Sequence, residues 1–339
     1  MFGPQYTITP ILLECIKHIT LLVHDLNRRH VSEVALMQLQ EEARAVSAFA
    51  STSIEGNPLP LTEVKRILKK QPQPARISEW EVLNYNEVLI QYYSSARVSL
   101  DKTLLLQIHQ RVMRDLLPEH QAGQLRREPV IVHNPRSGEI IYRPPDHADV
   151  ETLVDELLAF VHENQPLLDP LLLAGLFHKQ MVIIHPFVDG NGRTTRLATS
   201  ALLAGLNLNK AKLFSFENYY NQNVTRYFQH VGVSGNYYDL EDNVDFTTWL
   251  EYFAGGILDE LLRVEKEIER RGGTPSDRLK PYHHLILDYI DEHGFITDRD
   301  YAQLTERAKA TRTLDFNKLI ELGLIRRKGR GRGIYYERS

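Results

Sequence analysis

The chain has 339 residues, enough for two or three domains, and its 40 basic and 44 acidic residues nearly balance. This balance argues against a protein whose overall charge attracts nucleic acid or a membrane surface. One cysteine, Cys15, excludes an internal disulfide framework, and the longest apolar stretch, Leu171 to Ile184, is too short to span a bilayer. The N-terminus shows no signal-peptide pattern, so we expect a cytoplasmic protein that does not contact a membrane.

Residues 8 to 49 carry apolar side chains at helical spacing and predict two amphipathic helices, separated at Asn27 to His30. The second helix runs into Ser51 and ends near Gly56, a typical helix-stop residue. Glu55 lies where the helix dipole disfavours negative charge, although it could simply decorate the helix end.

Thr62 opens the next predicted helix, and residues 71 to 74 read as a linker. A further helix is predicted over 78 to 93, with Ser78 as its cap and Glu81 as the capping-box partner. Asp101 is expected to cap a helix over 100 to 117, on which His109 is interpreted as structural.

Residues 123 to 145 depart from the helical pattern. The stretches 129 to 133 and 139 to 143 predict a β-hairpin with a turn at 134 to 138. A lone two-stranded hairpin is only marginally stable, so it is either a surface excursion or is retained for function. An amphipathic helix is predicted after it, over 150 to 162.

The stretch from His185 to Arg196 reads HPFVDGNGRTTR and lies between two predicted helices. The first helix, from Leu171 to Ile184, is opened by Asp169 and Pro170, and the second begins near Thr194. Gly190, Asn191 and Gly192 would let several backbone N–H groups point outward together at the start of that second helix. Such a nest at a helix N-terminus binds anions, most often phosphates.

Polar residues around this nest have the chemistry of a nucleotide site. The Asp189 carboxylate suits a divalent metal that bridges phosphates, and His185 can accept a proton near neutral pH. Arg193 and Arg196 are three residues apart, hence on one helix face, and their planar guanidinium groups suit phosphate oxygens. Each residue alone has an ordinary structural explanation, but together they predict a phosphate site.

Aromatic and amide groups concentrate over residues 218 to 228. They suit an adenine site, in which Tyr227 is a candidate contact, although Tyr-rich helices more often serve packing. A long helix follows over 246 to 269, and Gly272 to Ser276 reads as a linker.

The last part of the chain predicts three helices and then a two-stranded ribbon, an order that resembles a winged helix. Residues 326 to 333 are strongly basic, and the third helix begins with Lys309 and Arg312, so DNA is a candidate partner. The alternative is a protein-binding or dimerising unit with a solvated basic ribbon.

The stretch from His185 to Arg196 resembles the signature of Fic-domain proteins, His-x-Phe-x-(Asp/Glu)-Gly-Asn-Gly-Arg-x-x-Arg, at every specified position. The resemblance implies a mainly α fold and transfer of AMP from ATP to a hydroxyl side chain of a target protein. It gives His185 the role of base and Asp189 that of Mg²⁺ ligand. Asn191 and the amides of the flanking glycines would hold phosphates, and Arg193 and Arg196 would bind the outer ones.

The same family has a hairpin beside its active site that takes a target segment by strand addition, which implies a target protein bound at the flap of residues 130 to 143. Ser51, Glu55 and Gly56 match the motif (Ser/Thr)-x-x-x-Glu-(Gly/Asn) of members that carry their own inhibitory helix. In those proteins the glutamate pairs with the second signature arginine, here Arg196, and blocks correct binding of the ATP γ-phosphate.

These observations predict a mainly α protein with three parts: an N-terminal helical domain with the inhibitory helix over 1–98, a Fic helical-bundle core with a β-hairpin flap over 99–271, and a winged helix over 277–339. Two other functions remain open: removal of AMP from a modified target at the same site, and a DNA-binding regulator that senses nucleotide. Phosphoryl or phosphocholine transfer is disfavoured because the Gly-Asn-Gly-Arg pattern matches the AMP-transferring members. A homodimer is a further candidate assembly.

Overall fold

The computed structural model describes residues 2–29, 31, 33–70, 76–94, 100–133, 138–205, 212–271 and 279–339. The predicted linkers at 71 to 74 and at Gly272 to Ser276, and most of the hairpin turn, lie outside these residues. The fold is mainly helical, as predicted. Within the described part, no helix is both long and apolar enough to cross a membrane.

The chain divides into two compact units, one formed by Met1–Asn27 with Leu39–Val264 and the other by Arg28–Gln38 with Glu265–Ser339. The predicted domain boundary after residue 98 stays a prediction. Helices from both sides of it pack together, because α4 (Ile77–Ser94) contacts α5 (Lys102–Val112), and both contact α8 (Asn191–Gly205).

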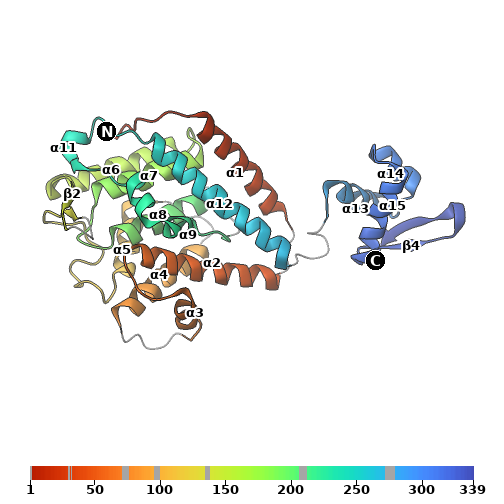
Figure 1. Ribbon diagram of the computed structural model, residues 1–339, viewed down its shortest axis with the longest axis horizontal. Coiled ribbons are helices and arrows are strands. Elements are labelled where there is room, and N and C mark those ends of the chain that lie inside the picture. Colours follow the sequence, from red (N-terminus) through yellow and green to blue (C-terminus); the bar gives the residue numbers. More distant parts are fainter. Residues whose placement is uncertain are drawn as a thin grey trace. The chain divides into compact units, whose positions relative to one another are not determined.

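The remaining helices up to residue 271 are α1 (Pro10–Arg28), α2 (Glu33–Ile54), α3 (Leu61–Lys70), α6 (His147–Asn164), α7 (Pro170–Ile184), α9 (Phe216–Gln222), α10 (Val224–Val231), α11 (Tyr237–Leu240) and α12 (Thr247–Arg271). Helix α7 forms the centre of the core and packs against α6 and α8 (Figure 1). Every residue of α7 except Pro170 and Val182 is buried. Asp169 caps the helix as predicted, since its carboxylate accepts a hydrogen bond from Leu171 N over 2.8 Å.

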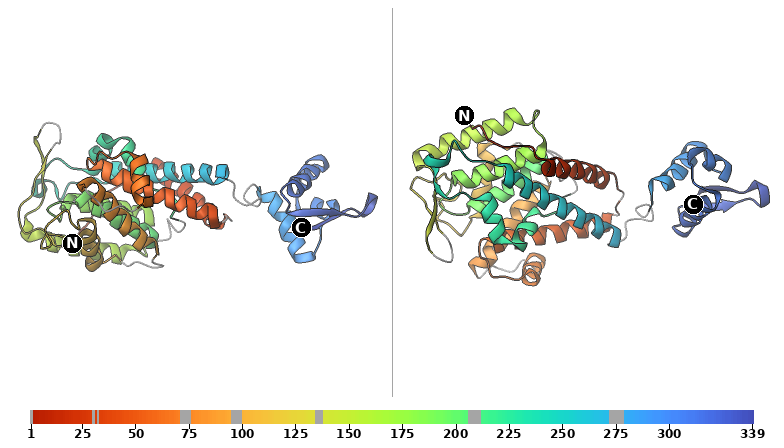
Figure 2. Two further views of the ribbon diagram at one scale, coloured as in Figure 1. Left: turned by 90° about the horizontal axis from the view of Figure 1, so that it is seen from below. Right: turned by 45° about the horizontal axis from the view of Figure 1, so that its top comes forward.

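The predicted hairpin is present, with β1 (Val132–His133) antiparallel to β2 (Ile140–Arg143). It is not an isolated pair, because β3 (Gly235–Asn236) adds to β2 in parallel. Figure 2 shows the hairpin at the edge of the helical core. The side chain of Tyr142 anchors it there, since the Tyr142 hydroxyl donates to Ile183 O at the end of α7 over 3.0 Å.

Two helix boundaries differ from the prediction. Helix α4 begins at Ile77, so Ser78 lies inside the helix and does not form a capping box with Glu81. Helix α5 ends at Val112 rather than near residue 117, because the chain turns beyond it and Asp115 adopts a positive φ of 62°. The predicted Asp101 cap of α5 is confirmed by its bond to Leu104 N.

The C-terminal part contains α13 (Pro281–His293), α14 (Asp298–Leu304), α15 (Lys309–Glu321), β4 (Ile325–Lys328), the 3₁₀ turn η2 (Gly331–Gly333) and β5 (Tyr335–Arg338). Strands β4 and β5 pair antiparallel, and Ile296 bridges to Tyr336. The C-terminal part has a small hydrophobic core of its own, which includes Ile290, Phe316 and Leu319. The elements follow the predicted order, while the assignment as a winged helix stays a prediction.

Candidate active site

His185 is the C-cap of α7 and adopts a left-handed backbone conformation, with φ 51° and ψ 60°. A non-glycine residue is uncommon there and needs its surroundings to hold it. Arg126 does so, because its Nε donates to His185 O over 2.8 Å and its backbone N donates to Pro186 O over 2.9 Å. Arg126 also donates to Glu128 O and Pro145 O, at the two ends of the hairpin. One buried guanidinium therefore ties the predicted base to the predicted flap.

Asn191 closes the loop between α7 and α8. Its Oδ1 accepts from Phe187 N over 2.9 Å, and its Nδ2 donates to Phe187 O over 2.8 Å. Gly190 has a φ of 76°, and a Cβ there would overlap the Met113 side chain. Both polar atoms of the Asn191 amide thus bond within the loop. In this structure Asn191 would therefore act on a phosphate by fixing the shape of the loop.

His109 holds the same loop from α5. Its Nδ1 accepts from Gly123 N over 2.8 Å, which leaves Nε2 as the donor to Asp189 O at 3.0 Å. The ring stacks on Phe187 with centroids 3.8 Å apart. Burial lowers the pKa of His109 to about 4, although its bond to the Asp189 backbone acts in the opposite direction. His109 is neutral at pH 7 and has the structural role expected from the sequence.

The Asp189 side chain is 62% exposed and lies 3.6 Å from Arg193 Nη2. Among the residues described, no group of three or more His, Cys, Asp or Glu residues gathers as a metal site. Mg²⁺ commonly uses one or two protein carboxylates and completes its octahedral shell with phosphate and water. A single exposed carboxylate beside an anion site fits that requirement, and the role of Asp189 as metal ligand stays a prediction.

Glu55 pairs with Arg196. Arg196 Nη2 donates to Glu55 Oε1 over 2.6 Å, while Nε and Nη2 donate to Ser51 Oγ and Ser51 O over 2.7 and 3.0 Å. Gly56, with φ 93°, ends the segment in a left-handed turn. A Cβ on Gly192 would overlap Glu55, so glycine at this position permits the close approach. The Nε–Nη2 edge of Arg196 is fully occupied by the end of the α2 segment.

Arg196 is completely buried. Burial alone lowers its pKa, but the Glu55 carboxylate and the hydroxyls of Tyr227 and Tyr85 hold the pKa above its ordinary value. The guanidinium is therefore charged, and Glu55 is its carboxylate partner.

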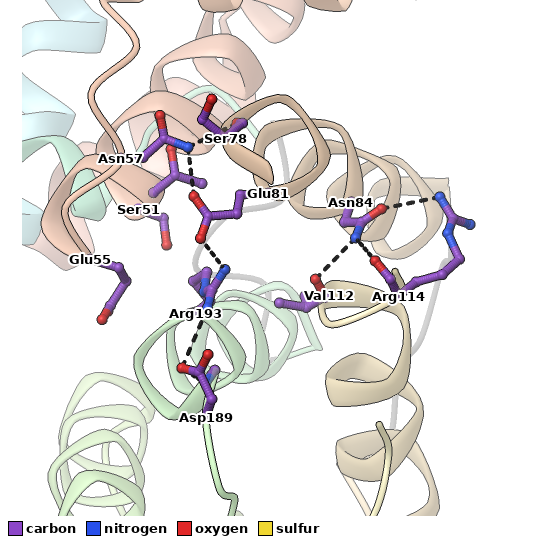
Figure 3. A network of polar contacts seen from close by, with 12 residues as sticks. Ser51, Glu55, Asn57, Ser78, Glu81, Asn84, Val112, Arg114, Asp189 and Arg193 are labelled. Atoms are coloured by element: carbon purple, nitrogen blue, oxygen red, sulfur yellow. Dashed lines mark hydrogen bonds and ion pairs between the residues drawn. The ribbon is translucent and has the colours of Figure 1, made fainter. Parts of the chain in front are cut away.

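Arg193 has a carboxylate partner that the sequence did not predict. Figure 3 shows Arg193 between Glu81 of α4 and Asp189, with Arg193 Nη1 donating to Glu81 Oε1 over 2.9 Å. Asn57 Nδ2 donates to the other oxygen of Glu81 over 2.7 Å and to Ser78 O over 2.8 Å. Glu81 was expected to close a capping box, and no sequence signal connects it with a residue so far along the chain.

Some of the buried polar atoms in the described part of the site have no hydrogen-bond partner. They include Arg193 Nε, Arg196 Nη1 and the hydroxyls of Thr194 and Thr195. Leaving a buried donor unpaired is unfavourable, more so when it is charged. These groups lie in the first two turns of α8, where the free backbone N–H groups and the helix dipole also favour negative charge. An anionic ligand at this helix start would offer acceptors to the unpaired guanidinium nitrogens.

Burial lowers the pKa of His185 to about 4, and the positive charge of Arg126 contributes to the decrease. The backbone of Val182 and the carboxylates of Glu55 and Asp189 act in the opposite direction. The imidazole is consequently neutral at pH 7, which is the form that can accept a proton.

Tyr227 is 1% exposed. Its ring stacks on Tyr220 with centroids 4.6 Å apart, and its hydroxyl lies 3.1 Å from His178 Nε2. The ring therefore packs within an aromatic cluster of α7, α9 and α10, and its role as an adenine contact stays a prediction.

Comparison with known proteins agrees with this geometry. The model of the Fic/DOC family matches residues 99–203. The protein adenylyltransferase Fic of Drosophila melanogaster and that of Drosophila simulans are each 32% identical over 183 residues, which cover 51% of this chain and 35% of theirs. The chain thus spans about a third of the length of these curated relatives.

Solved Fic structures share the fold. A Fic family protein from Desulfovibrio desulfuricans G20 superposes with a TM-score of 0.63 at 20% identity, covering 100% of this chain and 98% of its own. Fic-1 from C. elegans superposes with a TM-score of 0.60 at 20% identity, covering 77% of this chain and 74% of its own. These structures show a shared fold, and the matched family model, whose range contains the loop of residues 185 to 196, identifies a Fic domain over residues 99–203.

Proposed function

We propose that this Fic-domain protein is a protein adenylyltransferase, which transfers AMP from ATP to a Ser, Thr or Tyr hydroxyl of a target protein. The observation that carries the proposal is the set of unpaired buried guanidinium nitrogens at the start of α8, beside a neutral histidine and an exposed carboxylate. The names of the Drosophila relatives agree with it.

In the proposed reaction, neutral His185 takes the proton of the target hydroxyl, whose oxygen forms a bond to the α-phosphorus of ATP. The bond between that phosphorus and the oxygen of the β-phosphate breaks, and pyrophosphate leaves. Arg193, Arg196 and the α8 amides stabilise the charge on the phosphates. Mg²⁺ held by Asp189 would neutralise further phosphate charge when bound.

Glu55 is proposed to restrain this reaction. A carboxylate that occupies the Nε–Nη2 edge of Arg196 competes directly with phosphate oxygens for the same donors. ATP that cannot engage Arg196 would bind with its phosphates misplaced, and small misplacements of reacting atoms reduce rates strongly.

The flap is proposed to take an extended segment of the target. Strand β3 pairs with β2 at Tyr142 and Arg143, and the side chains of Ile140 and Ile141 are exposed. On the side of β2 that faces β3, residues 140 and 141 lie beyond the end of β3 and offer backbone groups for an added strand.

The test is incubation of wild type, Glu55→Gly and Glu55→Gly/His185→Ala with α-labelled ATP and Mg²⁺, in buffer and in a cell lysate. We expect labelled protein with Glu55→Gly, little label with wild type, and none without His185. Absence of label from every variant that still binds ATP would contradict AMP transfer. Loss of label from a pre-modified target would instead support AMP removal.

A further inference from the structure

Arg193 and Arg196 each bind a carboxylate, but through different parts of the guanidinium. Ser51 and Glu55 take the Nε–Nη2 edge of Arg196. Glu81 takes Arg193 at Nη1, on the far side from Nε, and Arg193 Nε has no partner within the described residues. Glu81 therefore leaves Arg193 Nε unpaired, whereas Ser51 covers the corresponding nitrogen of Arg196.

The Glu81 carboxylate is itself held in place. Asn57 Nδ2 donates to Glu81 Oε2, and Asn57 Oδ1 accepts from Leu59 N over 3.0 Å, which fixes the amide orientation. Glu81 is 19% and Arg193 5% exposed at the side chain, so their 2.9 Å ion pair is largely shielded from water. The chain Asn57–Glu81–Arg193 is a continuous polar connection (Figure 3).

Asp189 is the other carboxylate near Arg193, at 3.6 Å from its Nη2. Arg193 and Asp189 already form this long ion pair, and loss of Glu81 would leave Asp189 to draw Arg193 closer. A closer pair would neutralise the carboxylate predicted to hold Mg²⁺ and would turn Arg193 Nε away from the phosphates.

We propose that Glu81, held by Asn57, is a positioning residue that keeps Arg193 directed at the phosphates of the nucleotide and prevents it from closing further on Asp189. This inference rests on the proposed function, because it deepens the account of the same site. It gives the segment 51–57 two opposite actions: Ser51 and Glu55 cover Arg196, while Asn57 supports Arg193 through Glu81. Removal of the whole segment would consequently lose a supporting contact together with the restraint.

The test compares Glu55→Gly with Glu55→Gly/Glu81→Gln and Glu55→Gly/Asn57→Asp, where Asp keeps the oxygen that caps Leu59 but loses the donor to Glu81. Glu87→Gln in the same background is the matched control, because Glu87 also lies on α4 and pairs with an arginine, Arg114, outside the motif. Calorimetry measures the affinity for an ATP analogue that cannot be cleaved at the α-phosphate, over a series of Mg²⁺ concentrations. Melting temperature checks folding.

We expect both double variants to bind the analogue on the order of tenfold more weakly and to need more Mg²⁺, as for loss of a charge-assisted contact. The Glu87 control should match Glu55→Gly. Unchanged or tighter binding by both double variants would overturn the proposal, because it would mean that Glu81 is passive or obstructs Arg193. If Glu81→Gln does not fold, the Asn57 variant decides alone.

Analogue binding does not require AMP transfer. A Glu55→Gly protein that binds the analogue but labels nothing would contradict the proposed function, while the Glu81 comparison would still be decided.

Discussion

The buried arginines of α8 and Arg312 of the C-terminal unit differ in how completely their nitrogens are satisfied. Arg193 and Arg196 each keep a buried nitrogen without a partner. Arg312 at the start of α15 uses all three nitrogens, with two bonds to Asp298 and one to Arg307 O. Each nitrogen of Arg312 therefore already has an acceptor, whereas Arg193 and Arg196 each keep a buried donor that an anion could satisfy.

The largest expected effect is that of Arg196→Ala in the Glu55→Gly background. Loss of a preorganised donor to the phosphates should lower AMP transfer on the order of a hundredfold or more. Steady-state labelling at saturating target measures it, with Arg312→Ala in the same background as the control. Equal loss in both variants would mean that Arg196 and Arg312 do not differ in their effect on AMP transfer.

Replacement of Asp189 by Asn should have the next largest effect. Because it removes the charge that would hold Mg²⁺, the Mg²⁺ concentration for half-maximal labelling should rise on the order of tenfold or more. Titration of Mg²⁺ at fixed ATP measures this shift. An unchanged midpoint would argue that another group binds the metal.

The third prediction concerns pH. His185 has a pKa lowered by burial to about 4, so it loses basicity only as the pH falls towards that value. AMP transfer by Glu55→Gly should therefore change little between about pH 6 and 8 on account of this group. A rate profile with an inflection near the ordinary histidine pKa of 6.5 would contradict a base that is neutral over this range.

Stability should follow the same titration. Unfolded histidine binds a proton near its ordinary value of 6.5, whereas folded His185 does so near 4. The unfolded state thus binds more protons between these values, so stability is lost as the pH falls through this window. Thermal unfolding at several pH values measures the loss, and His109 contributes in the same direction.

The smallest effect is expected in the C-terminal ribbon. Arg327 and Arg330 are exposed, and neither has an ion-pair partner within the described residues. If DNA binds there, replacing both by Gln should reduce the logarithmic salt slope of binding by about 2, while Arg312→Gln leaves it unchanged. A salt titration of duplex binding measures the slope, and no salt-sensitive binding by wild type would remove DNA as a partner.

Local features of this protein could be predicted from sequence because their partners are close along the chain. The Asp101 and Asp169 caps bind residues two or three positions away, and the loop from His185 to Arg196 is one contiguous motif. Its glycines, histidine and arginines are visible as a pattern, and their positions at the α7–α8 junction follow from it.

Glu81 could not be predicted in this way. Its spacing from Ser78 suggested a capping box, but helix α4 begins one residue before Ser78, and the carboxylate turns to partners 24 and 112 residues away. The pairing of β3 with β2 could not be predicted for the same reason, since it joins residues near 235 to residues near 142. Such contacts depend on how the helices pack against one another, and helix periodicity does not specify this packing.

The loop between α7 and α8, which Asn191 closes and whose Phe187 stacks on His109, also affects the entropy cost of binding a nucleotide. Its backbone is fixed by bonds within the protein, so the loss of chain freedom occurs when the protein folds and not when nucleotide arrives. We therefore expect a nucleotide to meet a loop already in its final shape. Under the proposed function, ATP would then have to displace only the Ser51–Glu55 segment from Arg196.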